Sequence, residues 1–84
     1  MTITVRLFAI LRECAGTDVL TMELRDGATV AEAVKKIASE IAAVREHLNR
    51  VAFAVNREYV KELTVLREGD ELALIPPVSG GCDE

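Results

Sequence analysis

The chain has 84 residues, of which 50% are hydrophobic and only 4% aromatic, and its formal net charge is −4. This length and composition predict one globular domain with an aliphatic core and exclude a disordered chain. Lysine and arginine are scattered and form no basic stripe, which argues against nucleic acid and anionic membranes as partners.

The first predicted element is a strand at residues 2–8. Ile3, Val5 and Leu7 alternate with polar residues, which is the period of a strand that buries one face. The alternation also leaves no long apolar run, so we expect neither a signal peptide nor a membrane span, and a cytoplasmic location. Residues 20–24 repeat the pattern after a turn rich in glycine and aspartate, which predicts a hairpin partner strand.

A single long helix is predicted next. Thr29 and Glu32 form the capping-box pattern that starts a helix. The apolar residues that follow recur at spacings of four and three, so they lie on one stripe over about five helical turns. They are Val30, Val34, Ile37, Ile41, Val44 and Leu48. We expect this stripe to pack on the sheet.

The rest of the domain is predicted to be mostly strand. Residues 51–55 form a short apolar run typical of an interior strand, and residues 71–75 form the last strand before two prolines. The weaker patterns at 59–60 and 64–66 indicate a minor edge strand and a crossing loop. One amphipathic helix on a mixed sheet gives a two-layer α+β domain at residues 1–75.

The tail, residues 76–84, is the most informative part of the sequence. Pro76 and Pro77 favour an extended run and lack backbone donors, so we expect a flexible arm that projects from the domain. Gly80 and Gly81 have no Cβ, and a segment of this kind can pass through a narrow channel. The pattern is typical of a chemical handle that a second protein uses.

A set of short motifs runs in a fixed order through nearly the whole chain. They are residues 7–13 (Leu-Phe-Ala-Ile-Leu-Arg-Glu), Gly16, 54–56 (Ala-Val-Asn), Leu66, 69–71 (Gly-Asp-Glu) and 75–81 (Ile-Pro-Pro-Val-Ser-Gly-Gly). Together they resemble the sulfur-carrier (small) subunits of molybdopterin synthase, in the MoaD/ThiS family of ubiquitin-like β-grasp proteins. A paired glycine alone is weak evidence, whereas the proline-rich arm directly after a Gly-Asp-Glu strand is specific.

The resemblance implies a β-grasp fold and a sulfur-transfer cycle. A ubiquitin-activating-like adenylyltransferase would use ATP to activate the carboxylate of Gly81. Gly80, the residue before it, also has no side chain. A sulfurtransferase would then help convert it to a thiocarboxylate. The sulfur would pass to cyclic pyranopterin monophosphate in the large subunit of a heterotetrameric synthase. By this resemblance the chain binds no cofactor directly and is not an enzyme on its own.

Strand parity predicts a docking surface beside the arm. Because Leu7 should face the helix, Phe8 falls on the outward face with Arg6, and Ile75 falls opposite its neighbouring leucine. Apolar side chains on an outward face predict a patch that the activating enzyme and the large subunit use in turn. The expected partner-binding residues are Phe8, Ile75, Pro76, Pro77, Val78 and Ser79.

The sequence departs from the family pattern after Gly81, where Cys82, Asp83 and Glu84 follow. A glycine held in a peptide bond has no carboxylate to adenylate, so we expect a peptidase to remove residues 82–84. Attack of the Cys82 thiol on the Gly81 carbonyl is disfavoured, because no base stands beside it and an ordinary thiol is mostly protonated at neutral pH.

Three alternatives remain open from the sequence. The same activated glycine would serve a ubiquitin-like modifier that forms an isopeptide bond with a lysine. It would equally serve a sulfur carrier for another pathway, such as thiazole, cysteine or thio-tRNA synthesis. The third alternative is a plain interaction module.

Overall fold

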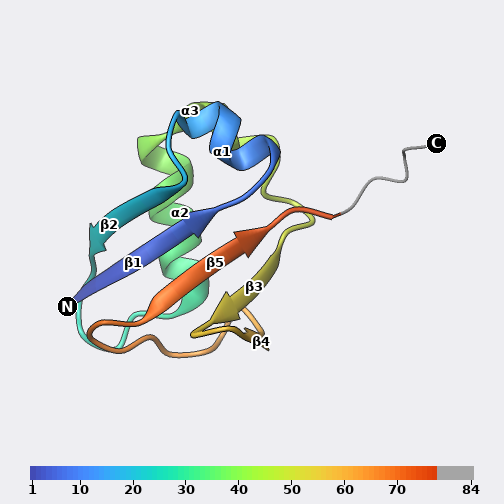
Figure 1. Cartoon of the computed structure of the whole chain (residues 1–84). Coiled ribbons are helices and arrows are strands. Elements are labelled where there is room, and N and C mark those ends of the chain that lie inside the picture. Colours follow the sequence, from blue (N-terminus) through green and yellow to red (C-terminus); the bar gives the residue numbers. More distant parts are fainter. Residues whose placement is uncertain (78–84) are drawn as a thin grey trace.

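The computed structural model describes residues 1–77 and shows two layers, a five-stranded mixed sheet and a main helix across one of its faces (Figure 1). The strands are β1 (Thr2–Leu7), β2 (Val19–Glu23), β3 (Ala52–Val55), β4 (Glu58–Val60) and β5 (Glu71–Ile75). The helices are α1 (Ile10–Ala15), α2 (Val30–Glu40) and α3 (Ala42–Arg45). This architecture confirms the predicted α+β β-grasp fold.

The sheet places its last strand in the centre. The strand order is β2-β1-β5-β3-β4, with β5 parallel to β1 and antiparallel to β3. Parallel neighbours end at the same edge of a sheet, so the C-terminal ends of β1 and β5 lie together. Figure 1 shows the chain leaving the sheet from this edge, at the end of β5.

The core lies between the sheet and α2. The large buried apolar residues of the sheet share one face, as period-2 alternation requires, and they are Ile3, Val5, Leu7, Met22, Leu72 and Leu74, whereas the small buried Ala54 lies on the opposite face. Helix α2 covers this face with Val30, Ala33 and Ile37, which are 0% exposed. Each large side chain buried in this way contributes about 2 kcal/mol to folding.

The predicted capping box is present at the start of α2. The backbone N–H of Glu32 donates to Thr29 Oγ1 at 3.3 Å, and the backbone N–H of Thr29 donates to Glu32 Oε2 at 3.4 Å. The two bonds satisfy donors that the first helical turn otherwise leaves free. Local sequence therefore determines where this helix begins.

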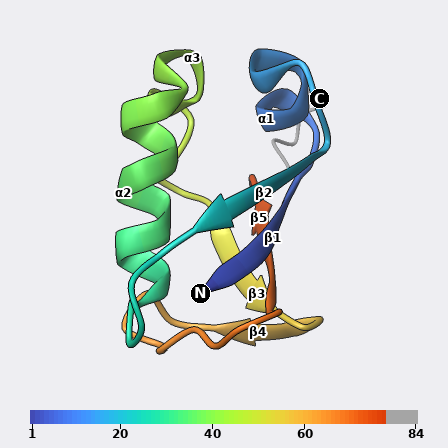
Figure 2. The same cartoon turned by 90° about the vertical axis from the view of Figure 1, so that its left-hand side faces the viewer.

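The prediction of one long helix through Leu48 is wrong. Helix α2 ends at Glu40, Ile41 adopts a non-helical φ of −125° and ψ of 85°, and α3 is a separate short helix. An unbroken helix over the whole stripe would be about 28 Å long, longer than a sheet of five- or six-residue strands. The break lets α3 pack against α1 at one end of the sheet (Figure 2), while Val44 stays buried.

Helix α1 was not predicted. It has only six residues, too few for a helical period to show in the sequence. Leu11 is 0% exposed and joins the core, and Gly16 ends the helix with a left-handed φ of 78° and an N–H bond to the Arg12 carbonyl at 2.9 Å. Tertiary burial of Leu11 therefore stabilises an element with little helical signal of its own.

The remaining boundaries differ from the prediction by small amounts. β1 ends at Leu7, one residue early, because the chain turns at Ala9. β4 is the edge strand, whereas residues 64–66 contribute an isolated bridge between Val65 and Thr29. Within residues 1–77 no helix is long and apolar enough to cross a membrane.

Candidate functional site

The root of the predicted arm is the C-terminal end of β5. Ile75, the last residue of this strand, lies opposite Ala52 of β3, and the chain continues into a half-buried Pro76 and an exposed Pro77. The arm therefore starts from the middle of the sheet, between β1 and β3. The predicted site residues Val78, Ser79, Gly80 and Gly81, and the segment 82–84, lie outside the described residues.

Phe8 lies beside the root of the arm. In the parallel register Leu7 of β1 is the partner of Leu74 in β5, so the next residues, Phe8 and Ile75, leave the two strands at the same edge. Phe8 is 42% exposed and Ile75 is half-buried. Ile75 lies on the open face as strand parity predicts, whereas β1 ends one residue before Phe8, and the role of both residues in docking stays a prediction.

A sharp turn holds Phe8 at this edge. Ala9 has φ 53° and ψ −126°, a region that glycine adopts readily and alanine does not. The turn ends β1 and starts α1, whose first residue, Ile10, is 39% exposed. Two large apolar side chains are thus presented to solvent next to the arm.

The open face of the sheet, opposite α2, carries a shallow cavity. In the sheet register Arg6 lies opposite Ala73, Ala73 opposite Ala54, and Ala54 opposite Tyr59. The two alanines are short, and the larger side chains around them enclose a cavity of about 380 Å³. Its lining consists of Arg6, Ala54, Arg57, Tyr59, Glu71, Ala73 and Ile75.

Sequence reasoning missed Tyr59 as a residue of this surface. Tyr59 is 76% exposed and stands across the cavity from Arg6. It lies in a three-residue strand with little periodicity, and only its register with Ala54 places it on the same face as Ile75. Only the strand pairing, and not the local sequence pattern, could have predicted that Tyr59 lies on this surface.

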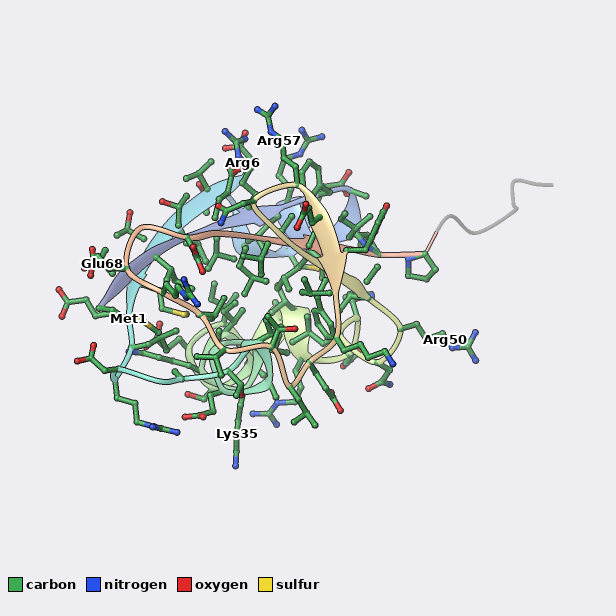
Figure 3. All side chains as sticks on the ribbon, turned by 90° about the horizontal axis from the view of Figure 1, so that it is seen from below. Met1, Arg6, Lys35, Arg50, Arg57 and Glu68 are labelled. Carbon is green, nitrogen blue, oxygen red and sulfur yellow. The ribbon has the colours of Figure 1, made fainter. Side chains whose placement is uncertain are left out.

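The cavity is more basic than the chain as a whole. Arg6 Nε pairs with Glu71 Oε2, whereas Arg57 takes part in no ion pair within residues 1–77. With Arg6 and Arg57 against Glu71, the formal charge of the lining is +1, although the chain carries −4. Figure 3 shows Arg6 and Arg57 projecting from one side of the molecule, with Lys35 on the opposite side.

The motifs at residues 54–56 and 69–71 meet at the end of this face. The Asn56 backbone N–H donates to the Glu71 carbonyl at 2.8 Å, and the Glu71 N–H donates to Asn56 Oδ1 at 3.0 Å. Asn56 Nδ2 also donates to Asp70 Oδ1 at 3.0 Å. These bonds tie the β3–β4 turn to the start of β5, so the two motifs have a structural role.

A second hollow of about 320 Å³ lies at the base of the arm. Its lining consists of Ile10, Pro76, Pro77 and residues that follow α3, among them His47. Within residues 1–77 no group of three His, Cys, Asp or Glu side chains could hold a metal ion.

Residues 5–81 match the model of the ThiS family. A molybdopterin synthase sulfur carrier subunit from Chlamydomonas reinhardtii is 41% identical over 83 residues, which cover 96% of this chain and 100% of that protein. The Arabidopsis thaliana protein of the same name is 35% identical over 79 residues, covering 94% of this chain and 82% of its own length.

Solved structures extend the similarity. SAMP1 from Haloferax volcanii superposes with a TM-score of 0.88 at 29% identity, covering 96% of this chain and 100% of that one. A putative molybdopterin converting factor subunit 1 from Pyrococcus furiosus gives 0.85 at 30% identity, with 93% and 99% covered. A Helicobacter pylori complex of subunits 1 and 2 of molybdopterin-converting factor gives 0.71 at 28% identity, with 96% and 100% covered. Because the family match spans most of the chain and the relatives match over most of their own length, this chain belongs to the ThiS (MoaD-like) family of β-grasp proteins.

Proposed function

We propose that this protein is the sulfur carrier subunit of molybdopterin synthase in molybdenum cofactor biosynthesis. The main support is the 41% identity with a sulfur carrier subunit over 96% of the chain, a match that reaches the glycine pair. The fold agrees with this role, since the central strand β5 leads directly into the arm that carries Gly80 and Gly81.

The carrier residue in this proposal is Gly81. Its free carboxylate is a poor electrophile, so an adenylyltransferase first joins it to the AMP part of ATP, with pyrophosphate as the leaving group. Sulfide-level sulfur, provided with the help of a sulfurtransferase, then attacks the acyl carbon, displaces AMP and leaves a thiocarboxylate. In the large subunit this group donates its sulfur to cyclic pyranopterin monophosphate and reverts to a carboxylate.

The chain itself is a non-catalytic donor in this scheme. ATP binds to the activating partner, the pterin binds to the large subunit, and this chain binds no cofactor directly. Glycine suits the terminal position because it lacks a side chain that would hinder attack in a narrow channel. We assign the cycle to the cytoplasm, where ATP and reduced sulfur donors are both available.

Activation requires that Gly81 become the last residue. In the sequence Gly81 is joined to Cys82, so its carbonyl is an amide that cannot form an adenylate. We therefore propose that a peptidase removes residues 82–84 before the first cycle.

The docking surface in this proposal is the open face of the sheet and the edge beside the arm. Phe8 and Tyr59 provide exposed apolar area, and Ile75 connects the cavity with the arm. Residues 76–79 would enter the partner with the glycine pair. The Helicobacter pylori relative was solved as a complex of two subunits, which supports use of the large subunit as the partner.

Reconstitution tests the proposed function. The chain ending at Gly81 is incubated with the activating enzyme, ATP and a sulfur donor, and its intact mass is followed. We expect the mass to increase by the difference between sulfur and oxygen. The mass should return to its starting value when the large subunit and the pterin are added. Absence of the thiocarboxylate, or a thiocarboxylate that the large subunit does not consume, would argue against the proposal.

A ubiquitin-like modifier is the second candidate. It is favoured by the TM-score of 0.88 with SAMP1 and of 0.86 with another Haloferax volcanii structure described as small archaeal modifier protein 1. A modifier leaves Gly81 in isopeptide bonds to lysines, which tryptic mass spectrometry of cell extracts detects. Sulfur carriage for thiazole, cysteine or thio-tRNA synthesis would give the thiocarboxylate without its consumption by the large subunit.

A further inference from the structure

The turn between β3 and β4 carries an arginine where glycine would be the more stable choice. Val55 pairs with Glu58, so Asn56 and Arg57 form a two-residue hairpin loop, and their φ angles are 52° and 73°. A loop with positive φ at both central residues favours Asn followed by Gly. Asn56 follows this preference and Arg57 does not, so Arg57 occupies a conformation that costs an L-residue free energy.

The strained turn is held rigidly. Three hydrogen bonds of 2.8 to 3.0 Å join Asn56 to Glu71 and Asp70 at the start of β5. The position of Arg57 is therefore fixed relative to the central strand. Backbone strain that is held in place by its surroundings is often associated with function.

Arg57 lines the open-face cavity, and within residues 1–77 its charge has no ion-pair partner. The side chain is exposed and lines the same cavity as Tyr59 and Ile75. The other cation of the lining, Arg6, already pairs with Glu71. Of the two nearby acids on the turn side, Asp70 accepts hydrogen bonds from Asn56 Nδ2 and from the Arg67 N–H, and Glu58 forms no ion pair within residues 1–77.

We propose that Arg57 is a partner-recognition residue, which pairs with a carboxylate on the molybdopterin synthase large subunit when the open face docks. The matching partner surface would carry an acidic side chain beside an apolar one that contacts Tyr59 and Ile75. The proposal rests on the proposed function, because it takes the large subunit as the protein that receives the arm. Two observations support the proposal. The cavity has a formal charge of +1 on a chain of net charge −4, so it suits an acidic partner surface, and the cavity is continuous with the root of the arm.

Calorimetric titration of the chain ending at Gly81 with the large subunit, and in parallel with the activating enzyme, tests this proposal. The variants are Arg57→Gln, which removes the charge, Arg57→Lys, which keeps it, and Arg57→Gly, which removes it and relieves the backbone. Lys35→Gln is the matched control, because it removes the same unit charge from an exposed site on the opposite side of the molecule (Figure 3).

We expect Arg57→Gln and Arg57→Gly to weaken binding about fivefold at low salt and less at high salt, as for a charge at the rim of an interface. Arg57→Lys should retain most of the affinity, and Lys35→Gln should leave it within about twofold. Arg57→Gly should also raise the melting temperature, because glycine relieves the strained backbone. Such a rise would mean that the arginine at this position lowers the stability of the fold.

Each contrary outcome identifies what has failed. If wild type binds the large subunit and Arg57→Gln binds equally well, the role of Arg57 is overturned and the proposed function stands. An equal loss of affinity in Lys35→Gln would overturn the specific pairing of Arg57, because it would mean that binding depends only on the net charge of the chain. A loss seen only with the activating enzyme would overturn the choice of partner, and a wild-type chain that does not bind the large subunit would overturn both proposals.

Discussion

The side-chain Oδ1 of Asn56 accepts a hydrogen bond from the backbone N–H of Glu71 at 3.0 Å, which couples the β3–β4 turn to the strand that ends in the arm. The turn lies at one end of β5 and the arm at the other. The position of the open face relative to the root of the arm therefore depends on a contact between residues far apart in the sequence.

Asn56→Ala should lower the free energy of unfolding by about 2 kcal/mol, because it removes two side-chain hydrogen bonds and places alanine at a left-handed φ. Asn56→Gly should recover part of the loss, since glycine accepts that φ but cannot replace the bonds. Urea unfolding measures both, with Asn49→Ala as the control at an exposed asparagine. An effect of Asn56→Ala no larger than that of Asn49→Ala would show that the coupling contributes little.

The full-length chain should be inactive with the activating enzyme and ATP, whereas a chain that ends at Gly81 should be adenylated. The reason is the peptide bond between Gly81 and Cys82, which leaves no carboxylate to react. ATP–pyrophosphate exchange on both forms measures the difference, with intact mass confirming that the long form stays uncleaved. Equal exchange by both forms would remove the argument for trimming.

Phe8→Asp should weaken binding to the large subunit by about tenfold or more while the melting temperature changes little, because the side chain is already 42% exposed. Leu63→Asp is the matched control, since Leu63 is a large apolar residue that is 77% exposed and lies in the segment between β4 and β5, not at the end of β1 beside the arm. Binding by calorimetry is compared with thermal melting of each variant. A collapse in the stability of Phe8→Asp would place this residue in the core and not in the docking surface.

Ile37→Asp should unfold the domain, in contrast to Phe8→Asp. Ile37 is 0% exposed in the middle of the interface between α2 and the sheet, and a buried carboxylate without a partner costs about 4 kcal/mol or more. Circular dichroism and thermal melting test this expectation. A cooperative transition at the wild-type temperature would mean that the interface has room for a solvated charge.

Stability should fall in acid partly through Glu32. Its hydrogen bond with Arg25 is the main cause that lowers the pKa of this carboxyl, with a smaller contribution from the Thr29 N–H. A lowered pKa in the folded state means that the contribution is complete above the ordinary glutamate pKa of about 4.3 and is lost as the pH falls through the lower folded value.

Glu32→Gln tests this contribution, because glutamine keeps the capping geometry and loses the charge. The variant should melt below wild type at about pH 7, and the difference should shrink as the pH falls below the ordinary glutamate pKa of about 4.3 and through the lower folded value. Melting curves over a series of pH values from neutral to acid, with Glu40→Gln as the control at an exposed residue of the same helix, measure the effect. A difference that persists in acid would assign the loss to capping geometry and not to charge.

The sequence by itself determined the elements whose signals are local. Alternation in β1 and β5 fixed which side chains face the core, because successive residues of a strand point to opposite faces. The capping box of Thr29 and Glu32 fixed where α2 begins, because it needs only neighbouring residues. The order of the motifs up to Gly81 was enough to indicate the family that the comparisons show.

The tertiary structure decided what depends on contacts between distant segments. Helix α1 forms because Leu11 completes the core, and the long apolar stripe breaks at Ile41 because α3 packs on α1 at the end of the sheet. Tyr59 and Arg57 join the open face only through the pairing of β3 with β4 and β5. Strand register and helix packing are fixed by such non-local contacts, and no local period in the chain encodes them.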